Sequence, residues 1–194
     1  MSHYFTNDDV KSELFKFDIT LLDNSLSFYS DNGVFSKRGL DYGSRLLLET
    51  FLSENKKGKT LDVGCGYGVM GIFINKITEN AVDMIDINKR AVHLANMNIK
   101  ENNLNTIKAF VSDVYSNVEG KYKYIITNPP VRAGKDVVLK MLMDAKDYMD
   151  ETSELWFVMR KDHGLKSVLK LLEEEYNIKV LKRSKGFFVI KCVF

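Results

Sequence analysis

The chain has 194 residues, of which 45% are hydrophobic and 28% are charged, and its formal net charge is +2. This balance is typical of a soluble globular protein, and the length fits one domain with a small appendage. No apolar run approaches the roughly 20 residues needed to span a bilayer, which argues against a membrane protein. The mild positive charge permits a nucleic-acid partner but does not require one.

Two further features bear on the compartment. The N-terminus has no basic region followed by an apolar stretch, so we expect no secretory signal. The two cysteines, Cys65 and Cys192, are far apart and have no neighbour at metal-ligand spacing. We therefore expect two free thiols, no metal site and a cytoplasmic protein.

Residues 13–30 are predicted to form a β-hairpin. Phe17 and Ile19 alternate with polar residues, Asp23-Asn24 supplies a turn, and the alternation resumes afterwards. A loop at 33–36 and a helix at 41–52 follow. We expect an N-terminal hairpin appendage over 1–30 and the main domain over 31–194.

From Thr60 onward, short apolar runs alternate with segments of helical periodicity. Strands are predicted at 60–63, 81–86, 106–111, 122–127, 154–160, 177–183 and 187–193. Helices are predicted at 67–77, 88–102, 136–149 and 164–175. This alternation indicates an α/β fold with a doubly wound, mostly parallel, seven-stranded sheet. Because only Ser184-Lys185-Gly186 separates the last two strands, the sheet must end in an antiparallel hairpin.

A glycine-rich loop follows the strand at 60–63. Gly64, Gly66 and Gly68 let the backbone approach a ligand closely, and the next helix presents its N-terminus to that ligand. The sequence Gly66-x-Gly68-x-x-Gly71, with Asp86 twenty residues after Gly66, also matches the spacing of a nicotinamide-binding unit.

Asp62 favours a different cofactor. It lies inside the strand, where a carboxylate would repel a pyrophosphate but can receive the ammonium group of an amino-acid cofactor, directly or through water. The chain also has no second domain that would carry a hydride acceptor. We therefore favour an amino-acid cofactor over a dinucleotide.

The ends of the next two strands supply further candidate cofactor contacts. Asp86 can accept hydrogen bonds from both hydroxyls of a ribose, although it is also a candidate helix N-cap, as is Asn88. Asp113 can accept from an adenine amino group. Ile87 and Val114 can hold the adenine ring between them.

The two prolines of the chain stand together in Asn128-Pro129-Pro130, directly after the strand at 122–127. In a doubly wound sheet this turn faces the glycine loop across one crevice. Two acceptors lie in this turn, the Asn128 side-chain oxygen and the Pro129 carbonyl. They can accept hydrogen bonds from the two N–H groups of an exocyclic amine. This would aim the amine nitrogen at a methyl group on a sulfonium, which is transferred by in-line displacement. The prolines fix the backbone. The alternative interpretation is a rigid turn without a catalytic role.

Together these blocks resemble a known family. The residues Asp62-Val63-Gly64-Cys65-Gly66-Tyr67-Gly68 followed by Asn128-Pro129-Pro130 resemble class I methyltransferases that act on amino groups. Gly33-Val34-Phe35-Ser36 and Asp41-Tyr42-Gly43-Ser44 resemble the small-subunit ribosomal RNA guanine-N2 methyltransferases.

The resemblance implies a Rossmann-like class I methyltransferase that uses S-adenosylmethionine. Its substrate would be the N2 amine of a guanine in small-subunit ribosomal RNA, free or in the small ribosomal subunit. Phe35 would close over the cofactor and contact the substrate. Many relatives carry a stacking aromatic residue where this chain has Val131, and Arg132 is the candidate substitute. Arg132, Lys135 and Lys161 would contact the RNA backbone; the alternative for each is a solvated surface charge, which is favoured for Lys161.

Two alternatives remain open. In the first, the enzyme methylates another amine or amide, such as a protein glutamine, which Asn-Pro-Pro would hold equally well. Otherwise the chain would bind S-adenosylmethionine without catalysis, as a ribosome-assembly factor.

Overall fold

The computed structural model describes residues 13–34 and 39–194. The first elements are the strands β1 (Phe15–Leu21) and β2 (Asn24–Ser30) and the helix α1 (Tyr42–Ser53). The later elements are β3 (Thr60–Val63), α2 (Val69–Thr78), β4 (Val82–Asp86), α3 (Lys89–Glu101), β5 (Ile107–Val111), β6 (Tyr124–Thr127), η1 (Val131–Ala133), α4 (Lys135–Met143), η2 (Asp144–Tyr148), β7 (Glu154–Arg160), η3 (Lys161–His163), α5 (Leu165–Leu172), β8 (Asn177–Ser184) and β9 (Phe187–Val193).

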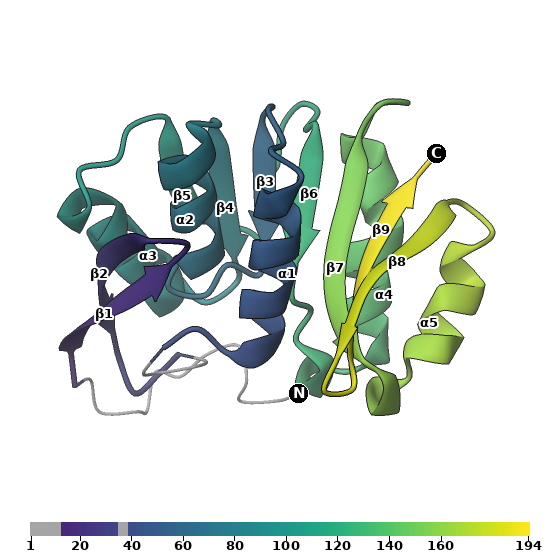
Figure 1. The fold of residues 1–194 in the computed structure, drawn as a ribbon, viewed down its shortest axis with the longest axis horizontal. Helices are drawn as coiled ribbons and strands as arrows, with labels where there is room; N and C mark the ends of the chain where they lie inside the picture. Colours follow the sequence, from purple (N-terminus) through teal and green to yellow (C-terminus); the bar gives the residue numbers. More distant parts are fainter. Residues whose placement is uncertain (1–12, 35–38) are drawn as a thin grey trace.

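The central sheet confirms the predicted topology. Its strands lie in the order β5-β4-β3-β6-β7-β9-β8, and the strands from β5 to β7 are parallel (Figure 1). β9 pairs antiparallel with both β7 and β8. The chain reverses its direction of winding between β3 and β6, so the carboxyl ends of these two strands flank a crevice suited to a ligand.

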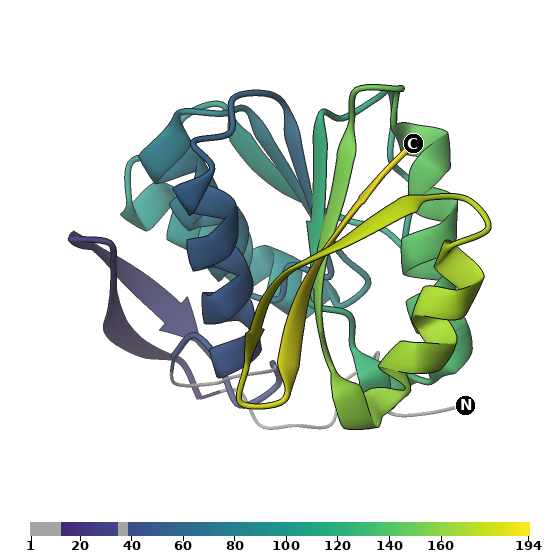
Figure 2. The same ribbon diagram turned by 45° about the vertical axis from the view of Figure 1, so that its right-hand side comes forward.

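Helices cover both faces of the sheet, with α1 to α3 on one side and α4 and α5 on the other (Figure 2). Each face has its own hydrophobic cluster. Trp156 and Phe157 are neighbours on β7, are both fully buried, and join different clusters. This alternation follows from the two-residue period of a strand, and it gives a sheet whose two faces are both buried.

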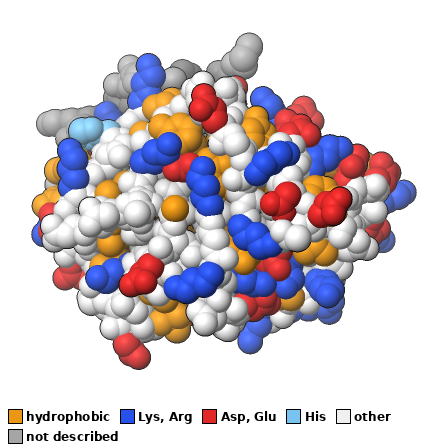
Figure 3. Space-filling model, turned by 90° about the horizontal axis from the view of Figure 1, so that it is seen from above, with side chains coloured by type: hydrophobic (Ala, Val, Ile, Leu, Met, Phe, Trp, Pro, Cys, Tyr) orange, Lys and Arg blue, Asp and Glu red, His pale blue; other side chains and the backbone are white. Residues whose placement is uncertain are grey.

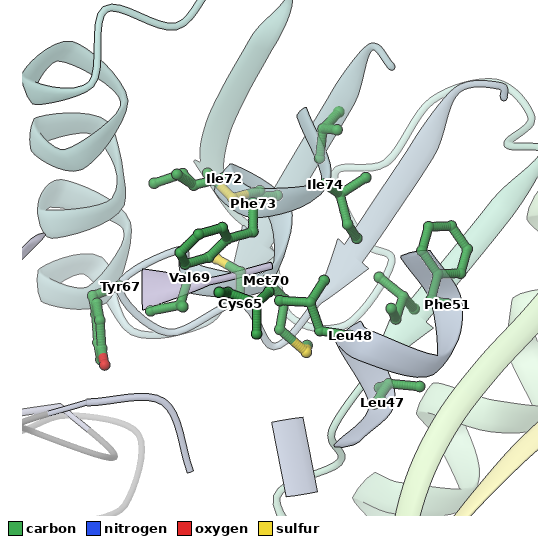
Figure 4. Packing of buried hydrophobic residues seen from close by; sticks show 14 of the residues in the cluster. Leu47, Leu48, Phe51, Cys65, Tyr67, Val69, Met70, Ile72, Phe73 and Ile74 are labelled. Carbon is green, nitrogen blue, oxygen red and sulfur yellow. The ribbon is translucent and has the colours of Figure 1, made fainter. Parts of the chain in front are cut away.

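The glycine loop is held by the packing of α1 against α2. Side chains of both helices and of the intervening Cys65 and Tyr67 form one cluster (Figure 4). Leu47, Leu48 and Phe51 on α1 are fully buried. Because close-packed interiors tolerate little displacement, this cluster fixes the loop that precedes α2.

The N-terminal hairpin forms as predicted, with its turn one residue earlier. Leu22 and Asp23 have φ of 45° and 61°, and Asn24 already pairs with Leu21. These two positive φ values are typical of the tight hairpin turn whose twist matches that of the strands. The prediction of an Asp23-Asn24 turn is therefore corrected to Leu22-Asp23.

Asn98 of α3 and Asn102, the C-cap of that helix, bind the outer edge of β2. Asn98 accepts from Tyr29 N at 2.6 Å and donates to Tyr29 O at 3.0 Å. Asn102 accepts from Ser27 N at 3.1 Å and donates to Ser27 O at 2.8 Å. The hairpin also shares its hydrophobic cluster with α1 to α3. The proposed boundary at residue 30 stays a prediction.

One predicted helix is divided. The segment expected as a single helix over 136–149 is α4 followed by the 3-10 helix η2. The Tyr148 carbonyl accepts from Tyr122 N at 2.9 Å, so the chain leaves the helix to meet the segment that leads into β6. The other predicted helices and strands are observed with boundaries shifted by a few residues.

Candidate functional site

A cavity of about 1000 Å³ lies at the carboxyl ends of the parallel strands, across the point where the sheet reverses. Its lining brings together most of the residues proposed from the sequence. They are Gly64, Gly66, Asp86, Ile87, Asp113, Val114, Asn128, Pro129, Pro130, Val131 and Arg132.

Three proposed residues, Asp62, Gly68 and Lys135, are not among the described lining residues. Asp62 is buried behind the wall formed by Val63 and Gly64. Lys135 donates to Ser167 Oγ at 2.8 Å, which ties α4 to α5. Gly68 is described below, and Phe35 lies outside the residues that the structure describes.

Two glycines of the loop have different roles. Gly66 has φ of 57°, and a Cβ built there would meet no described atom within 4 Å, so its backbone borders open space in the cavity. A Cβ on Gly68 would lie 3.1 Å from the Ala95 Cβ atom. Gly68 therefore lets α2 pack against α3, whereas Gly66 leaves room for a ligand.

Asp62 is fully buried beneath the loop. Its Oδ2 accepts from Gly71 N at 2.9 Å, and its Oδ1 has no hydrogen-bond partner. Burial raises the pKa of this carboxyl to about 7, the Gly71 N–H opposes the rise, and the nearby charge of Asp86 adds to it. An unpartnered buried carboxylate oxygen is costly, and a cation near the loop would relieve that cost.

Asp86 ends β4 and is anchored by backbone amides. Its Oδ2 accepts from Gly66 N and its Oδ1 from Asn88 N, both at 2.9 Å. Burial raises the pKa of Asp86, and the bonds from Asn88, Gly66 and Ile87 oppose the rise. Asn88 caps α3 by accepting from the Arg90 and Ala91 amides, so Asp86 is free of the capping role. Each oxygen keeps a lone pair for a ligand donor.

The loop after β5 forms the next part of the wall. Asp113 is exposed, and no described residue bonds to its carboxylate. Val114 is half-buried with φ of 50° and lines the cavity together with Ile87. The arrangement places two branched apolar side chains and one carboxylate where a flat heterocycle with an amino group would fit.

Asn128 follows β6, the strand beside β3 in the sheet, and lines the cavity. Its Nδ2 donates to Ser44 Oγ at 2.9 Å and approaches the Asp41 carboxylate at 3.3 and 3.5 Å. No described residue donates to its Oδ1 or to the Pro129 carbonyl. Thr127 Oγ1 donates to Val63 O at 2.7 Å, which ties this turn to the start of the glycine loop.

The outer part of the cavity is basic and aromatic. Arg132 is exposed and makes no ion pair with the described residues. Arg160 is bonded to Asp162 through two contacts of 2.9 Å and lies 5.4 Å from the centre of the Phe187 ring. His163 also lines this side. Cations and an aromatic ring together are suited to an anionic ligand that carries flat rings.

The described lining of the cavity carries three carboxylates, Asp41, Asp86 and Asp113, together with Arg132 and Arg160. Arg160 is paired with Asp162, whereas Arg132 has no ion-pair partner among the described residues. The opposite, amino-terminal edge of the sheet carries interspersed basic and acidic side chains (Figure 3). Arg132 is therefore the candidate contact for an anionic ligand at the cavity.

Over the described ranges, no helix is long and apolar enough to cross a membrane. Within the same ranges, no cluster of three His, Cys, Asp or Glu side chains is placed to hold a metal ion. Cys65 and Cys192 are both buried and free, and burial raises the pKa of each thiol.

Several lining residues were given no individual role by the sequence analysis, among them Ser44, Arg160 and Phe187. Asp41 and Ser44 precede or begin a helix, where Asp and Ser are common caps, so the pattern alone does not mark them. Phe187 begins a strand whose neighbours are equally apolar. Only the sheet order brings these segments beside Asn128.

The family model for the methyltransferase small domain matches residues 25–191. The Bacillus subtilis protein YbxB is 38% identical to this chain, and the aligned region covers 98% of this chain and 97% of YbxB. Ribosomal RNA small subunit methyltransferase C of Haemophilus influenzae strain Rd is 43% identical over 87% of this chain. The chain spans only about half, 51%, of that relative.

A solved structure has the same fold. It is the 16S rRNA N2 G1207 methyltransferase RsmC of T. thermophilus, in complex with AdoMet and guanosine. The TM-score is 0.84 at 22% identity, over 93% of this chain and 50% of that one. At this identity the match establishes the arrangement of elements.

Proposed function

Because the chain belongs to the methyltransferase small domain family, we propose that it methylates the exocyclic N2 amine of a guanine in small-subunit ribosomal RNA, with S-adenosylmethionine as methyl donor. The observation that carries the proposal is the pair of unoccupied acceptors, Asn128 Oδ1 and Pro129 O, across the cavity from the glycine loop. The names of the relatives support the RNA substrate. A ribosomal substrate implies a cytoplasmic location.

The residues of the cavity fit the donor. S-adenosylmethionine supplies a methyl group on a positively charged sulfur, together with an ammonium group, a ribose and an adenine. Asp86 would accept from the ribose hydroxyls, and Ile87 and Val114 would hold the adenine. The unpartnered Oδ1 of Asp62 explains how the loop would favour the ammonium group, through water or through the loop backbone.

The opposite wall fits an amine nucleophile. The N2 nitrogen of guanine is weakly nucleophilic, because its lone pair is delocalised into the ring. Two acceptors that bind its two N–H groups aim the nitrogen at the donor and stabilise the positive charge that develops on it. No general base is required before the attack, so positioning supplies most of the rate enhancement.

Phe187 is a second candidate for contact with the target base, beside Arg132. Its ring lines the cavity and lies 5.6 Å from the ring of Tyr42. It therefore supplies an aromatic surface to the cavity from β9. A guanine in duplex RNA must be extruded to reach this site, and stacking on an aromatic ring offsets the lost stacking.

The test is transfer of labelled methyl groups to small ribosomal subunits from a strain that lacks this protein, followed by mass mapping of the RNA. We expect one N2-methylguanine that forms with wild-type protein and forms about a hundred- to a thousandfold more slowly with Asn128→Ala, as when a group that stabilises the transition state is removed. Calorimetry with S-adenosylhomocysteine should show binding to Asn128→Ala and loss of binding for Asp86→Ala.

Other outcomes select the alternatives. Label that enters protein instead of RNA would indicate an amide substrate such as glutamine. A deletion phenotype that Asn128→Ala rescues in full would indicate a cofactor-binding assembly factor without catalysis. Tight NADH binding would contradict the proposed cofactor.

A further inference from the structure

The orientation of the Asn128 amide is set by α1. A carboxylate has no proton to donate, so the Asp41 side chain can face only the NH₂ end of that amide. Ser44 Oγ accepts from the same Nδ2 at 2.9 Å. Because the amide is planar, holding its NH₂ group on Asp41 and Ser44 turns Oδ1 to the other side.

We infer that Asp41 and Ser44 are positioning residues for methyl transfer, which act through Asn128 by holding its side-chain oxygen toward the target amine. The inference rests on the proposed function, since it supposes that the nucleophile carries N–H groups. All three residues line the same cavity.

The support for Asn128 is rigid because it comes from a helix. Asp41 caps α1, accepting from Ser44 N at 3.1 Å with its side chain and from Arg45 N at 2.9 Å with its carbonyl. A Cβ on Gly43 would lie 2.9 Å from Phe187 Cε1, so the helix start is packed closely against β9. Two acceptors fixed to a buried helix leave the amide little freedom to rotate.

The charge of Asp41 adds an electronic effect. A charged acceptor strengthens the bond from the amide NH₂, and this polarises the amide and makes its oxygen a better acceptor. If Asp41 were absent, the amide could rotate by half a turn and present its NH₂ group to the cavity. That donor would face the N–H groups of the substrate and repel them.

Asp41 also caps α1, so the test must separate the two roles. Asp41→Ser keeps a good N-cap but is too short to reach Asn128. Ser44→Ala removes the other acceptor. Ser53→Ala is the matched control, because Ser53 lies at the far end of α1 and donates only to Thr50 O, at 2.8 Å.

The measurement is steady-state kinetics with small subunits that lack the methyl group, together with thermal unfolding and calorimetry. For Asp41→Ser we expect kcat to fall about ten- to hundredfold, which is less than the roughly hundred- to thousandfold loss for a donor that itself contacts the transition state, because Asp41 acts through Asn128. The affinity for S-adenosylhomocysteine and the melting temperature should stay near wild type. Ser44→Ala should show a smaller fall in kcat, and Ser53→Ala none.

A double-mutant cycle tests the coupling. If Asp41 acts through Asn128, adding Asp41→Ser to Asn128→Ala should lower kcat no further. Effects that multiply in the double variant, or a wild-type kcat for Asp41→Ser, would overturn the inference while the proposed function stands.

A measurement without turnover keeps the two proposals distinct. In nuclear magnetic resonance spectra the Asn128 side-chain NH₂ should exchange slowly with solvent in the wild type and faster in Asp41→Ser. Equal exchange in both proteins would contradict the positioning role. Wild-type protein that transfers no methyl group to RNA would contradict the proposed function instead.

Discussion

At the scale of single residues, Asp62 stands out among the described carboxylates of the site, because it has a buried oxygen without a hydrogen-bond partner. It is buried, one oxygen is unpartnered, and its pKa is raised to about 7. A carboxyl with a raised pKa binds its proton more tightly in the folded than in the unfolded protein. Its contribution to stability is therefore fully present below the unfolded pKa of about 3.9 and is lost as the pH rises through about 7.

We predict that Asp62→Asn makes the free energy of unfolding less dependent on pH between about 4 and 8, since the amide cannot ionise. The difference from wild type across this range should be on the order of 4 kcal/mol at most, corresponding to about three pKa units. Asp86, whose pKa is also raised, will retain part of the dependence.

Urea unfolding at a series of pH values measures this effect in the absence of cofactor. Asp113→Asn is the control, because Asp113 is exposed and should leave the curve unchanged. If Asp62→Asn and wild type showed parallel curves, the Asp62 carboxyl would not titrate in this range.

At the scale of elements, the N-terminal hairpin shows how an edge strand can be completed by side chains. Asn98 and Asn102 are one helical turn apart, and each bonds both backbone groups of one β2 residue, Tyr29 and Ser27 respectively. Asn98 also donates to the Tyr67 carbonyl at 2.8 Å, so the hairpin is linked to the glycine loop. The hairpin thereby supports the cofactor side of the cavity.

We predict that Asn102→Ala lowers the free energy of unfolding by about 1–3 kcal/mol, because it leaves two partly buried backbone groups of Ser27 without partners. Asn98→Ala should cost more, since Asn98 is fully buried and its side chain also bonds the Tyr67 carbonyl in the glycine loop. Urea unfolding measures both. His93→Ala, on the exposed face of the same helix, should have little effect. If Asn98→Ala were as stable as the wild type, the bonds from Asn98 to β2 and the glycine loop would not contribute to stability.

At the scale of the whole molecule, charge is organised locally although the net charge is only +2. At the carboxyl edge of the sheet, Arg132 has no ion-pair partner among the described residues, and the aromatic ring of Phe187 lines the same cavity. The amino-terminal edge mixes both signs (Figure 3). RNA should therefore approach along the carboxyl edge.

We predict that Arg132→Glu raises KM for the RNA substrate at least several-fold and lessens the dependence of RNA binding on salt, because a phosphate contact is lost. The affinity for S-adenosylhomocysteine should not change. Lys121→Glu, before β6 at the opposite edge, is the matched control. An equal loss of RNA binding in both variants would place the RNA elsewhere.

The sequence by itself determined the order of helices and strands, the parallel sheet with its antiparallel end, and the main components of the pocket. These features depend on local periodicity and on loop length. The three residues expected between the last two strands, of which two remain in the structure, are too few for a crossover. Glycines and an Asn-Pro-Pro turn mark strand ends whatever the rest of the chain does.

Tertiary structure alone decided which residues support the site. Gly64, Gly66 and Gly68 are alike in sequence, but only packing against Ala95 sets Gly68 apart from Gly66. Asp41 reads locally as a helix cap, and its contact with Asn128 spans 87 residues. Such contacts depend on strand order and on the docking of α1, which arise from burial of two hydrophobic clusters rather than from any local pattern.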